Sequence, residues 1–166
     1  MQKVKFGMIG GGTVGSGVYH HWRRNGALMA SRLGVQINLK KVAVKAFAEP
    51  RPYEIPPGVM TTDWKEVVND PGIQVVIELI GGTGLAKEIV LTALKLGKSV
   101  ITANKALISA HGEELFATAK ANKANLYYEA SVAGGIPIIK VLREGLAGNR
   151  IERICGIQSD QQRDNR

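Results

Sequence analysis

The chain has 166 residues, 45% of them hydrophobic and 22% charged, with a formal net charge of +8. This length fits one domain with a proper core and is short for two. No apolar run in the sequence reaches the length of a membrane span, and we expect no secretory signal. The lone cysteine, Cys155, rules out an internal disulfide and fits a reducing cytoplasm. Positively charged residues are scattered along the sequence, and no group of aromatic residues that could stack on bases accompanies them. This pattern argues against nucleic-acid binding and fits attraction of an anionic cofactor.

The first predicted element is a short buried strand over residues 3–9, whose apolar run is bounded by glycine. Gly10-x-Gly12-x-x-Gly15 follows at once, and a helix is predicted from Thr13 to about Ser31. The first glycine of such a motif allows a tight turn, the second lets backbone approach a pyrophosphate, and the third lets the helix pack closely on its strand. Free N–H groups at the helix start favour bound phosphate. We therefore expect a dinucleotide site at Gly10, Gly12, Thr13, Val14 and Gly15.

A second strand is predicted over residues 35–44, and the residues after it bear on the choice of dinucleotide. A domain that prefers NAD usually carries Asp or Glu at this strand end, to bond the ribose 2′-hydroxyl. This chain has Lys45 there, with Arg51 close behind, and Glu49 arrives only after the strand should have ended. A cation at this place would pair with a 2′-phosphate, so we expect NADP to be favoured and NAD to be possible. The alternative is that Lys45 simply points into solvent.

The remaining elements are predicted to alternate between helix and strand. A proline-rich connection over residues 49–58 precedes a short helix over 62–69, capped by Thr62 or Asp63. Next come a buried strand over 73–80, a second glycine turn over 81–84, and a helix that Gly97 ends. The last elements expected are a strand over 99–102, a helix from about 112 to 122, a strand over 126–129 and a helix over 136–145.

This order predicts a Rossmann-like α/β fold, in which a doubly wound, mostly parallel sheet carries helices on both faces. Ligands of such sheets bind outside the carboxyl ends of the strands. Gly81 in the second glycine turn and Lys105, which follows the strand over 99–102, are therefore expected at the cofactor crevice. An ammonium group there can stabilise or protonate the negative oxygen that forms when hydride adds to an aldehyde. The alternative for Lys105 is an ordinary surface lysine in a loop.

Four stretches of the sequence resemble the nucleotide-binding domain of the homoserine dehydrogenase family. They are residues 10–17 (GGGTVGSG), 78–82 (ELIGG), 102–107 (TANKAL) and 128–139 (YEASVAGGIPII). The resemblance runs from about residue 3 to Ile157. It implies reversible reduction of L-aspartate 4-semialdehyde to L-homoserine with NAD(P)H, on the route to threonine, methionine and isoleucine.

The resemblance also implies roles for individual residues. Gly12 to Gly15 would hold the pyrophosphate, Lys45 with Arg51 would lie near the 2′-phosphate, and Lys105 would be the catalytic lysine at the nicotinamide end. A sodium ion would be bound by the side chain of Glu129 and the backbone of Val132, Gly134 and Ile136. A carboxylate with backbone carbonyls is a set that a hard cation accepts. The alternative for Glu129 is a carboxylate bonded to N–H groups of the following loop.

Beyond Ile157 the sequence departs from the pattern of the family. We expect residues 1–157 to form the NAD(P)-binding domain and the polar residues 158–166 to form a disordered tail, with the substrate and dimerisation domain of the family absent. The isolated chain should bind cofactor with hardly any turnover, and it should either be monomeric or expose apolar surface that another domain would cover. The parent is expected to be a homo-oligomer that acts on homoserine and aspartate semialdehyde, with no nucleic-acid or membrane partner.

Two other functions are open at this point. A semialdehyde dehydrogenase of the phosphorylating type shares the domain but needs a cysteine nucleophile, and Cys155 lies near the chain end without a neighbouring base motif. A non-catalytic module that binds NAD(P) and senses redox state would need no catalytic domain, which fits the expected absence of that domain. The enzyme-type sequence around Lys105 and Glu129 argues against that module.

Overall fold

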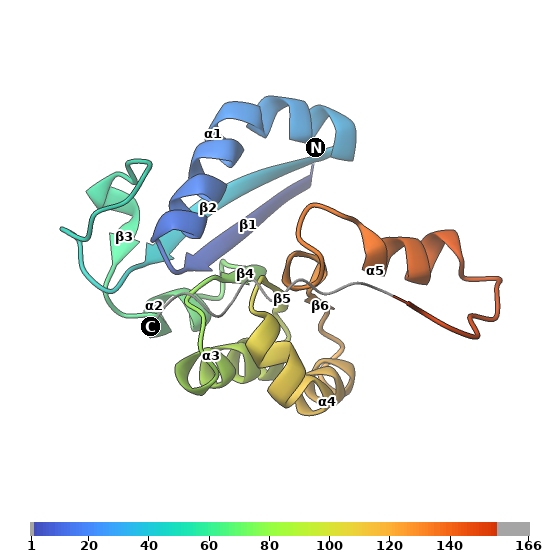
Figure 1. The fold of residues 1–166 in the computed structure, drawn as a ribbon. Coiled ribbons are helices and arrows are strands. Elements are labelled where there is room, and N and C mark those ends of the chain that lie inside the picture. The colour runs from blue at the N-terminus through green and yellow to red at the C-terminus, as the bar shows by residue number, and fades with distance from the viewer. Residues whose placement is uncertain (1, 156–166) are drawn as a thin grey trace.

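Six parallel strands form the sheet in the computed structural model, which describes residues 2–155 (Figure 1). Their order is β3-β2-β1-β4-β5-β6, and every neighbouring pair is parallel. β1 lies between β2 and β4, so the chain winds outward on both sides of its first strand. The predicted doubly wound α/β fold is thereby confirmed. The strands are β1 (Gln2–Ile9), β2 (Val35–Ala43), β3 (Met60–Thr61), β4 (Val75–Glu78), β5 (Ser99–Thr102) and β6 (Leu126–Tyr127).

Helices cover both faces of this sheet. Figure 1 shows α1 (Thr13–Leu33) over one face, with α3 (Gly84–Lys95) and α4 (Lys105–Ala121) against the other. Within residues 2–155 none of the helices combines the length and the apolar character needed to cross a bilayer. The shorter segments are η1 (Pro57–Val59), α2 (Lys65–Val68), η2 (Glu129–Ser131) and α5 (Ile138–Lys140), which continues as the π-helical turn η3 (Val141–Gly145).

Some element boundaries differ from the sequence prediction, and α4 differs most. It begins at Lys105 rather than near residue 112, because the Asn104 side chain accepts a hydrogen bond from the N–H of Leu107 at 3.1 Å. This cap satisfies a donor of the first turn. The helix expected over 62–69 is only the single turn α2, and Asp63 Oδ1 accepts from the N–H of Lys65 at 2.9 Å. β3 was not predicted at all, since two residues leave no periodic pattern.

The main core lies between the sheet and helices α3 and α4. Val76 of β4 and Val100 of β5 are fully buried against Ile89 and Leu94 of α3 and Leu115 of α4. Complete burial of one such side chain stabilises the fold by about 1.5–3 kcal/mol. This packing fixes β4 and β5 relative to the two helices whose amino ends follow them.

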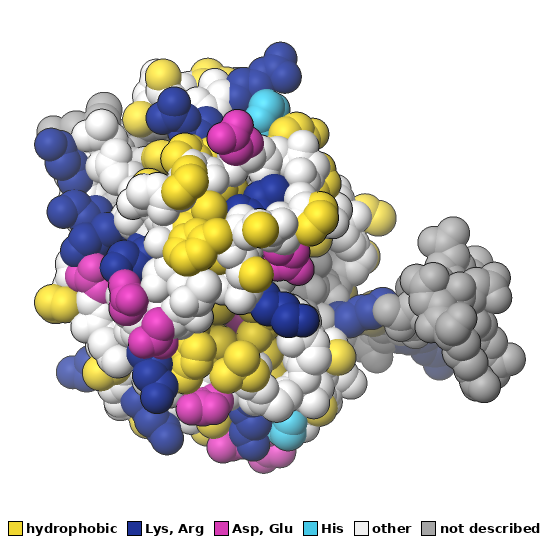
Figure 2. All heavy atoms as spheres, turned by 90° about the vertical axis from the view of Figure 1, so that its left-hand side faces the viewer, with side chains coloured by type: hydrophobic (Ala, Val, Ile, Leu, Met, Phe, Trp, Pro, Cys, Tyr) yellow, Lys and Arg dark blue, Asp and Glu magenta, His cyan; other side chains and the backbone are white. Residues whose placement is uncertain are grey.

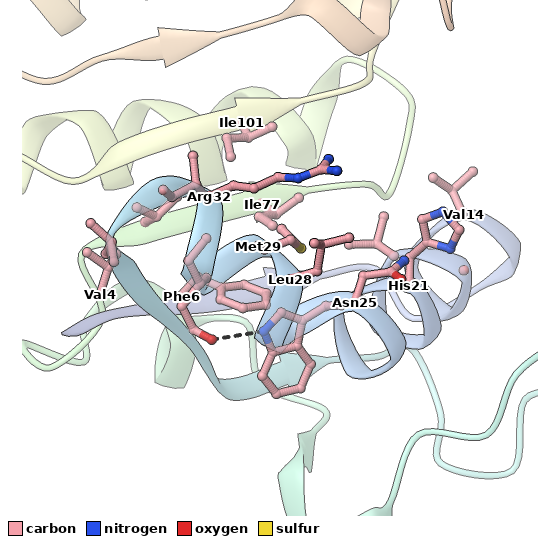
Figure 3. Close-up of a pocket in the computed structure, with 17 residues that line it drawn as sticks. Val4, Phe6, Val14, His21, Asn25, Leu28, Met29, Arg32, Ile77 and Ile101 are labelled. Atoms are coloured by element: carbon pink, nitrogen blue, oxygen red, sulfur yellow. Dashed lines mark hydrogen bonds between the residues drawn. The ribbon is translucent and has the colours of Figure 1, made fainter. Parts of the chain in front are cut away.

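An apolar groove of about 1140 Å³ lies between α1 and the opposite face of the sheet (Figure 3). Trp22 Nε1 of α1 donates to the carbonyl oxygen of Ile37 in β2 at 2.9 Å, which holds α1 against the β2 side. Ile77 of β4 and Ile101 of β5 also line the groove and remain partly exposed. The structure therefore leaves apolar surface uncovered on the β4–β5 side of this face. The side chains labelled in Figure 3 include Val4, Phe6, Leu28, Met29, Ile77 and Ile101.

Asp70 joins β2 to the loop that precedes β4. Its Oδ1 accepts hydrogen bonds from Lys40 Nζ at 2.7 Å and from the N–H of Gly72 at 2.8 Å. The bond from Lys40, together with that from Gly72, holds the pKa of Asp70 below its ordinary value. The charged form of this carboxyl group is thus favoured by the folded state.

We expect Asp70→Asn to lower the free energy of unfolding at about pH 7 and to lose this effect in acid. A depressed folded-state pKa contributes stability that is present above the unfolded value, about 3.9 for Asp. That contribution disappears as the pH falls through the folded value. Urea unfolding of both proteins between about pH 7 and about pH 2 measures the difference.

Glu113→Gln is the matched control, because the Glu113 side chain is exposed in the middle of α4. It should leave the stability of the protein unchanged at both ends of the range. A destabilisation by Asp70→Asn of the same size in acid and at neutral pH would contradict the electrostatic account.

Candidate functional site

A cleft of about 500 Å³ opens at the carboxyl ends of β1, β2 and β4. The chain leaves β1 toward β2 on one side, and β4 lies on the other side, so this is the topological switch point of the sheet. Three turns meet here: the first glycine loop, the segment after β2 and the second glycine turn. The cleft is lined by Ile9, Gly10, Gly11, Gly12, Ala43, Val44, Lys45, Glu49, Thr62, Trp64, Leu79, Ile80, Gly81, Leu85 and Ile89.

The third glycine of the first loop is required by packing. A Cβ atom at Gly15 would lie 1.9 Å from the carbonyl oxygen of Gly10, so any larger residue would push α1 away from β1. Gly12 differs, because a Cβ atom there would meet no protein atom within 4 Å. Gly12 lines the cleft, so the space beside it is open to a ligand.

Thr13 and Val14 begin α1, directly beside this open space. The first N–H groups of a helix have no acceptor inside the helix and are available to an anion. The side chain of Val14 lines the apolar groove on the other side of α1 (Figure 3). A contribution of Val14 to anion binding would therefore come from its backbone N–H.

The segment after β2 brings two opposite charges into the cleft. Lys45 is exposed and lines the cleft together with Glu49. Arg51 does not line it. Its Nη2 donates to the carbonyl oxygens of Ala46 at 3.1 Å and Phe47 at 3.3 Å, so its guanidinium group braces the loop that carries Lys45. The structure thus places Lys45, but not Arg51, at the wall of the cleft.

The second glycine turn and the start of α4 lie against one another. Gly81 lines the cleft, and the next residue, Gly82, accepts a hydrogen bond at its carbonyl oxygen from Asn104 Nδ2 at 2.6 Å. Lys105 follows Asn104 as the first residue of α4 and is exposed. It is therefore a residue of a helix start rather than of a loop. Its ammonium group can reach solvent beside the second glycine turn.

Glu129 lies at the start of η2, because β6 ends at Tyr127, earlier than predicted. Its two carboxylate oxygens each accept a backbone hydrogen bond at 2.9 Å, from the N–H groups of Ile139 and Lys140. Glu129 therefore binds backbone N–H groups that follow it, as in its alternative interpretation, but these groups belong to α5 rather than to the loop before it. No three His, Cys, Asp or Glu side chains in residues 2–155 are grouped as a metal site, so a cation here would depend on backbone oxygens. The predicted tail over 158–166 lies outside the described residues.

The cleft walls also carry apolar residues that are not among the site residues predicted from the sequence. Ile80 is 38% exposed and Leu85 is 50% exposed, and both line the cleft with Trp64. Figure 2 shows the side of the molecule toward which β1 and β2 run, where hydrophobic side chains reach the surface in patches among charged ones. Exposed apolar walls beside a glycine loop can pack against a planar ring. The sequence signal that could have identified these walls is the pair Ile80 and Leu85, the apolar residues on either side of the glycine turn over 81–84.

Comparison with known proteins gives consistent matches. A family model described as "Homoserine dehydrogenase, NAD binding domain" matches residues 10–129. The homoserine dehydrogenase of Bacillus subtilis is 43% identical over 157 residues, which are 95% of this chain and 36% of that protein. The Pseudomonas aeruginosa homoserine dehydrogenase is 46% identical over 158 residues, again 95% of this chain and 36% of that protein. This chain therefore spans about a third of the length of these relatives.

Solved structures match in the same way. The homoserine dehydrogenase of Thiobacillus denitrificans superimposes with a TM-score of 0.80 at 41% identity, over 90% of this chain and 35% of that one. A hyperthermophilic archaeal homoserine dehydrogenase in complex with NADPH gives a TM-score of 0.70 at 25% identity, over 89% of this chain and 50% of that one.

We expect Gly12→Ala to separate ligand binding from folding. The added methyl group meets no protein atom within 4 Å, so the free energy of unfolding should change by no more than about 1 kcal/mol. The same methyl group occupies the space through which a pyrophosphate would approach, so affinity for NADPH should fall by at least about tenfold. Calorimetric titration with NADPH and urea unfolding measure the two effects.

Gly17→Ala is the matched control, because a Cβ atom at Gly17, in the second turn of α1, also meets nothing within 4 Å. It should leave NADPH affinity unchanged. Equal affinities of the Gly12→Ala variant and the original protein would show that no ligand passes close to Gly12.

Proposed function

The chain belongs to the homoserine dehydrogenase family, whose NAD-binding domain it forms, and on that premise we propose that it binds NADP(H) in the cleft, with NAD(H) as a weaker ligand. In a complete protein it would supply the cofactor half of the reversible reduction of L-aspartate 4-semialdehyde to L-homoserine. Residues 1–157 are the proposed domain. The observation that carries the proposal is the open space at Gly12, between the first glycine loop and the start of α1.

The pyrophosphate is the part of the ligand that the site fits best. Gly10, Gly12 and Gly15 bring the backbone and the amino end of α1 to one wall of the cleft, with Thr13 and Val14 contributing N–H groups. A helix start carries partial positive charge and unpaired N–H donors, so it stabilises a bound phosphate. α1 begins without an acidic residue in its first turn, so no carboxylate competes for these donors.

The segment after β2 would receive the adenosine ribose. Lys45 is the proposed partner of a 2′-phosphate, and the brace formed by Arg51 holds the loop on which Lys45 lies. Glu49 in the same cleft repels a phosphate and can accept a hydrogen bond from a ribose hydroxyl. The preference for NADP over NAD should therefore be modest. The apolar walls at Ile80, Leu85 and Trp64 suit the adenine ring.

Lys105 is the proposed catalytic residue. Bound reduced nicotinamide supplies a hydride, and the aldehyde oxygen that receives negative charge needs a positive group or a proton donor. Lys105 begins α4 beside the second glycine turn, where the nicotinamide end of an extended cofactor would lie if the pyrophosphate is at the first loop. Its ammonium group would stabilise that oxygen and pass it a proton.

Glu129, Val132, Gly134 and Ile136 are the proposed ligands of a sodium ion. The Glu129 carboxylate already accepts two N–H groups, but a carboxylate has about four acceptor positions and keeps capacity for a cation. The carbonyl oxygen of Ile136 accepts from the N–H of Ile138 at 2.8 Å and likewise keeps a second lone pair. Such an ion would reinforce the loop before α5, and no chemical step depends on it.

We expect Lys45→Ala to weaken NADPH binding by about fivefold and to leave NADH binding within twofold. An exposed ion pair is worth up to about 1 kcal/mol, and NADH lacks the phosphate that would form it. Calorimetric titration with each cofactor at low ionic strength measures both affinities, and added salt should reduce the difference.

Lys95→Ala is the control, since Lys95 is an exposed lysine at the far end of α3. It should change neither affinity. Equal weakening of NADPH and NADH by Lys45→Ala would remove the proposed NADP preference while leaving the cofactor site intact.

We expect turnover when this chain is mixed with the part of the Pseudomonas aeruginosa relative that has no counterpart here, expressed as a separate polypeptide. Homoserine-dependent reduction of NADP should then appear, and Lys105→Met should lower kcat by about 10²–10⁴ because the group that accepts the hydroxyl proton of homoserine in this direction is lost. Lys120→Met, at the other end of α4, should leave kcat unchanged. Intact NADPH binding with no homoserine-dependent turnover in the mixture would favour the redox-sensing module instead.

A further inference from the structure

Three buried polar side chains connect the second glycine turn to the start of α4, and we propose that they are positioning residues for the nicotinamide end of the site. They are Glu78 at the end of β4, Thr102 at the end of β5, and Asn104 at the cap of α4. This inference rests on the proposed function, because it assigns the network to the part of the site that contains Lys105.

Glu78 accepts three hydrogen bonds in the network. It is fully buried, and its Oε1 accepts hydrogen bonds from the N–H groups of Ile80 at 2.9 Å and Gly81 at 3.3 Å. Its Oε2 accepts from the hydroxyl group of Thr102 at 2.7 Å. Burying a carboxylate without hydrogen-bond donors costs a large free energy. The donors just after β4 and at the end of β5 therefore stabilise Glu78, and Glu78 in turn restrains the backbone and side chain that carry them.

Thr102, at the end of β5, links Glu78 to Asn104 through two hydrogen bonds. Its hydroxyl group donates to Glu78 and accepts from the backbone N–H of Asn104 at 3.0 Å. Because a hydroxyl group has one proton to donate, this arrangement fixes its direction. Thr102 is fully buried, so water does not compete for either bond.

Asn104 makes the decisive bridge. Its Nδ2 donates to the carbonyl oxygen of Gly82 at 2.6 Å, and its Oδ1 accepts from the N–H of Leu107 at 3.1 Å. One partner is an acceptor and the other a donor, so the amide group has only one orientation that satisfies both. The side chain, which is 8% exposed, joins the second glycine turn to the first turn of α4.

The second glycine turn needs such a support. Gly81 and Gly82 both have positive φ, 72° and 69°, and two successive glycines restrain the backbone weakly by themselves. The network holds Gly81 through Glu78 and Gly82 through Asn104. Lys105 is the next residue after Asn104, so the turn and the catalytic lysine are set by the same side chain. The first glycine loop and Lys45 make no bond to this network.

The test uses Asn104→Ser in the full chain. Serine keeps an acceptor for the helix cap, but its side chain is too short to bond Gly82, so the helix start is preserved while the bridge is lost. We expect affinity for NADPH to fall by about tenfold, because part of the binding free energy must then order the turn that the bridge held. Affinity for 2′,5′-ADP, which has no nicotinamide, should stay within twofold. Calorimetric titration measures both.

The matched control is Asn122→Ser at the other end of α4, where Asn122 Nδ2 donates to the carbonyl oxygen of Thr118 at 2.9 Å. It removes a hydrogen bond donated by an equivalent side-chain amide far from the cleft, and it should change neither affinity. Parallel weakening of NADPH and 2′,5′-ADP by Asn104→Ser would indicate a general loss of structure and overturn the proposal. Unchanged NADPH affinity would overturn it as well.

A second measurement does not depend on the cofactor. In the ligand-free chain, Asn104→Ser should raise the hydrogen-exchange rates of amides over residues 80–84 by about tenfold, while the amides of α1 stay unchanged. If the original protein bound neither ligand, the proposed function would fail while this measurement still tested the bridge. Unchanged exchange over residues 80–84 would refute the positioning role even with normal binding.

Discussion

The distance between the start of α1 and the end of β1 controls the site, and the missing side chain at Gly15 sets that distance. A Cβ atom there would collide with the carbonyl oxygen of Gly10, so the helix can approach its strand only because position 15 is glycine. This contact directs the unpaired N–H groups of α1 to the carboxyl end of the central strand. The walls provided by β2 and β4 then enclose a cleft that the first glycine loop lines.

The sequence indicated the fold well because each part of its pattern has a local physical cause. Buried parallel strands appear as apolar runs, and glycine marks the ends of helices, as Gly97 does after α3. The errors occurred where a single cap or the pairing of a sheet edge, rather than apolar periodicity, decides the outcome. α4 gains its first turns from the cap formed by Asn104, and β3 exists only as a two-residue edge paired with β2. Neither feature leaves a periodic signal in the chain.

The site was predictable to the extent that its residues lie in recognisable motifs. The glycine loop and Lys45 line the cleft, and Lys105 lies beside the second glycine turn, because strand ends meet at one edge of a parallel sheet. Arg51 shows the limit of this reasoning, since its charge suits a phosphate but its Nη2 group donates to the carbonyl oxygens of Ala46 and Phe47 in its own loop. Glu78 shows it too, because a single acidic residue in an apolar strand does not reveal its three donors.

The strand order has a consequence for how the domain is assembled. β1 occupies a central place in the sheet, and each strand made later joins an edge that already exists. No strand has to be inserted between two earlier ones, so the sheet can grow in the order in which a ribosome delivers it. Binding elements follow the same order, because the first glycine loop is complete before the second turn is made. The first glycine loop is thus the oldest part of the cleft, and the walls that β2 and β4 contribute are added to it later.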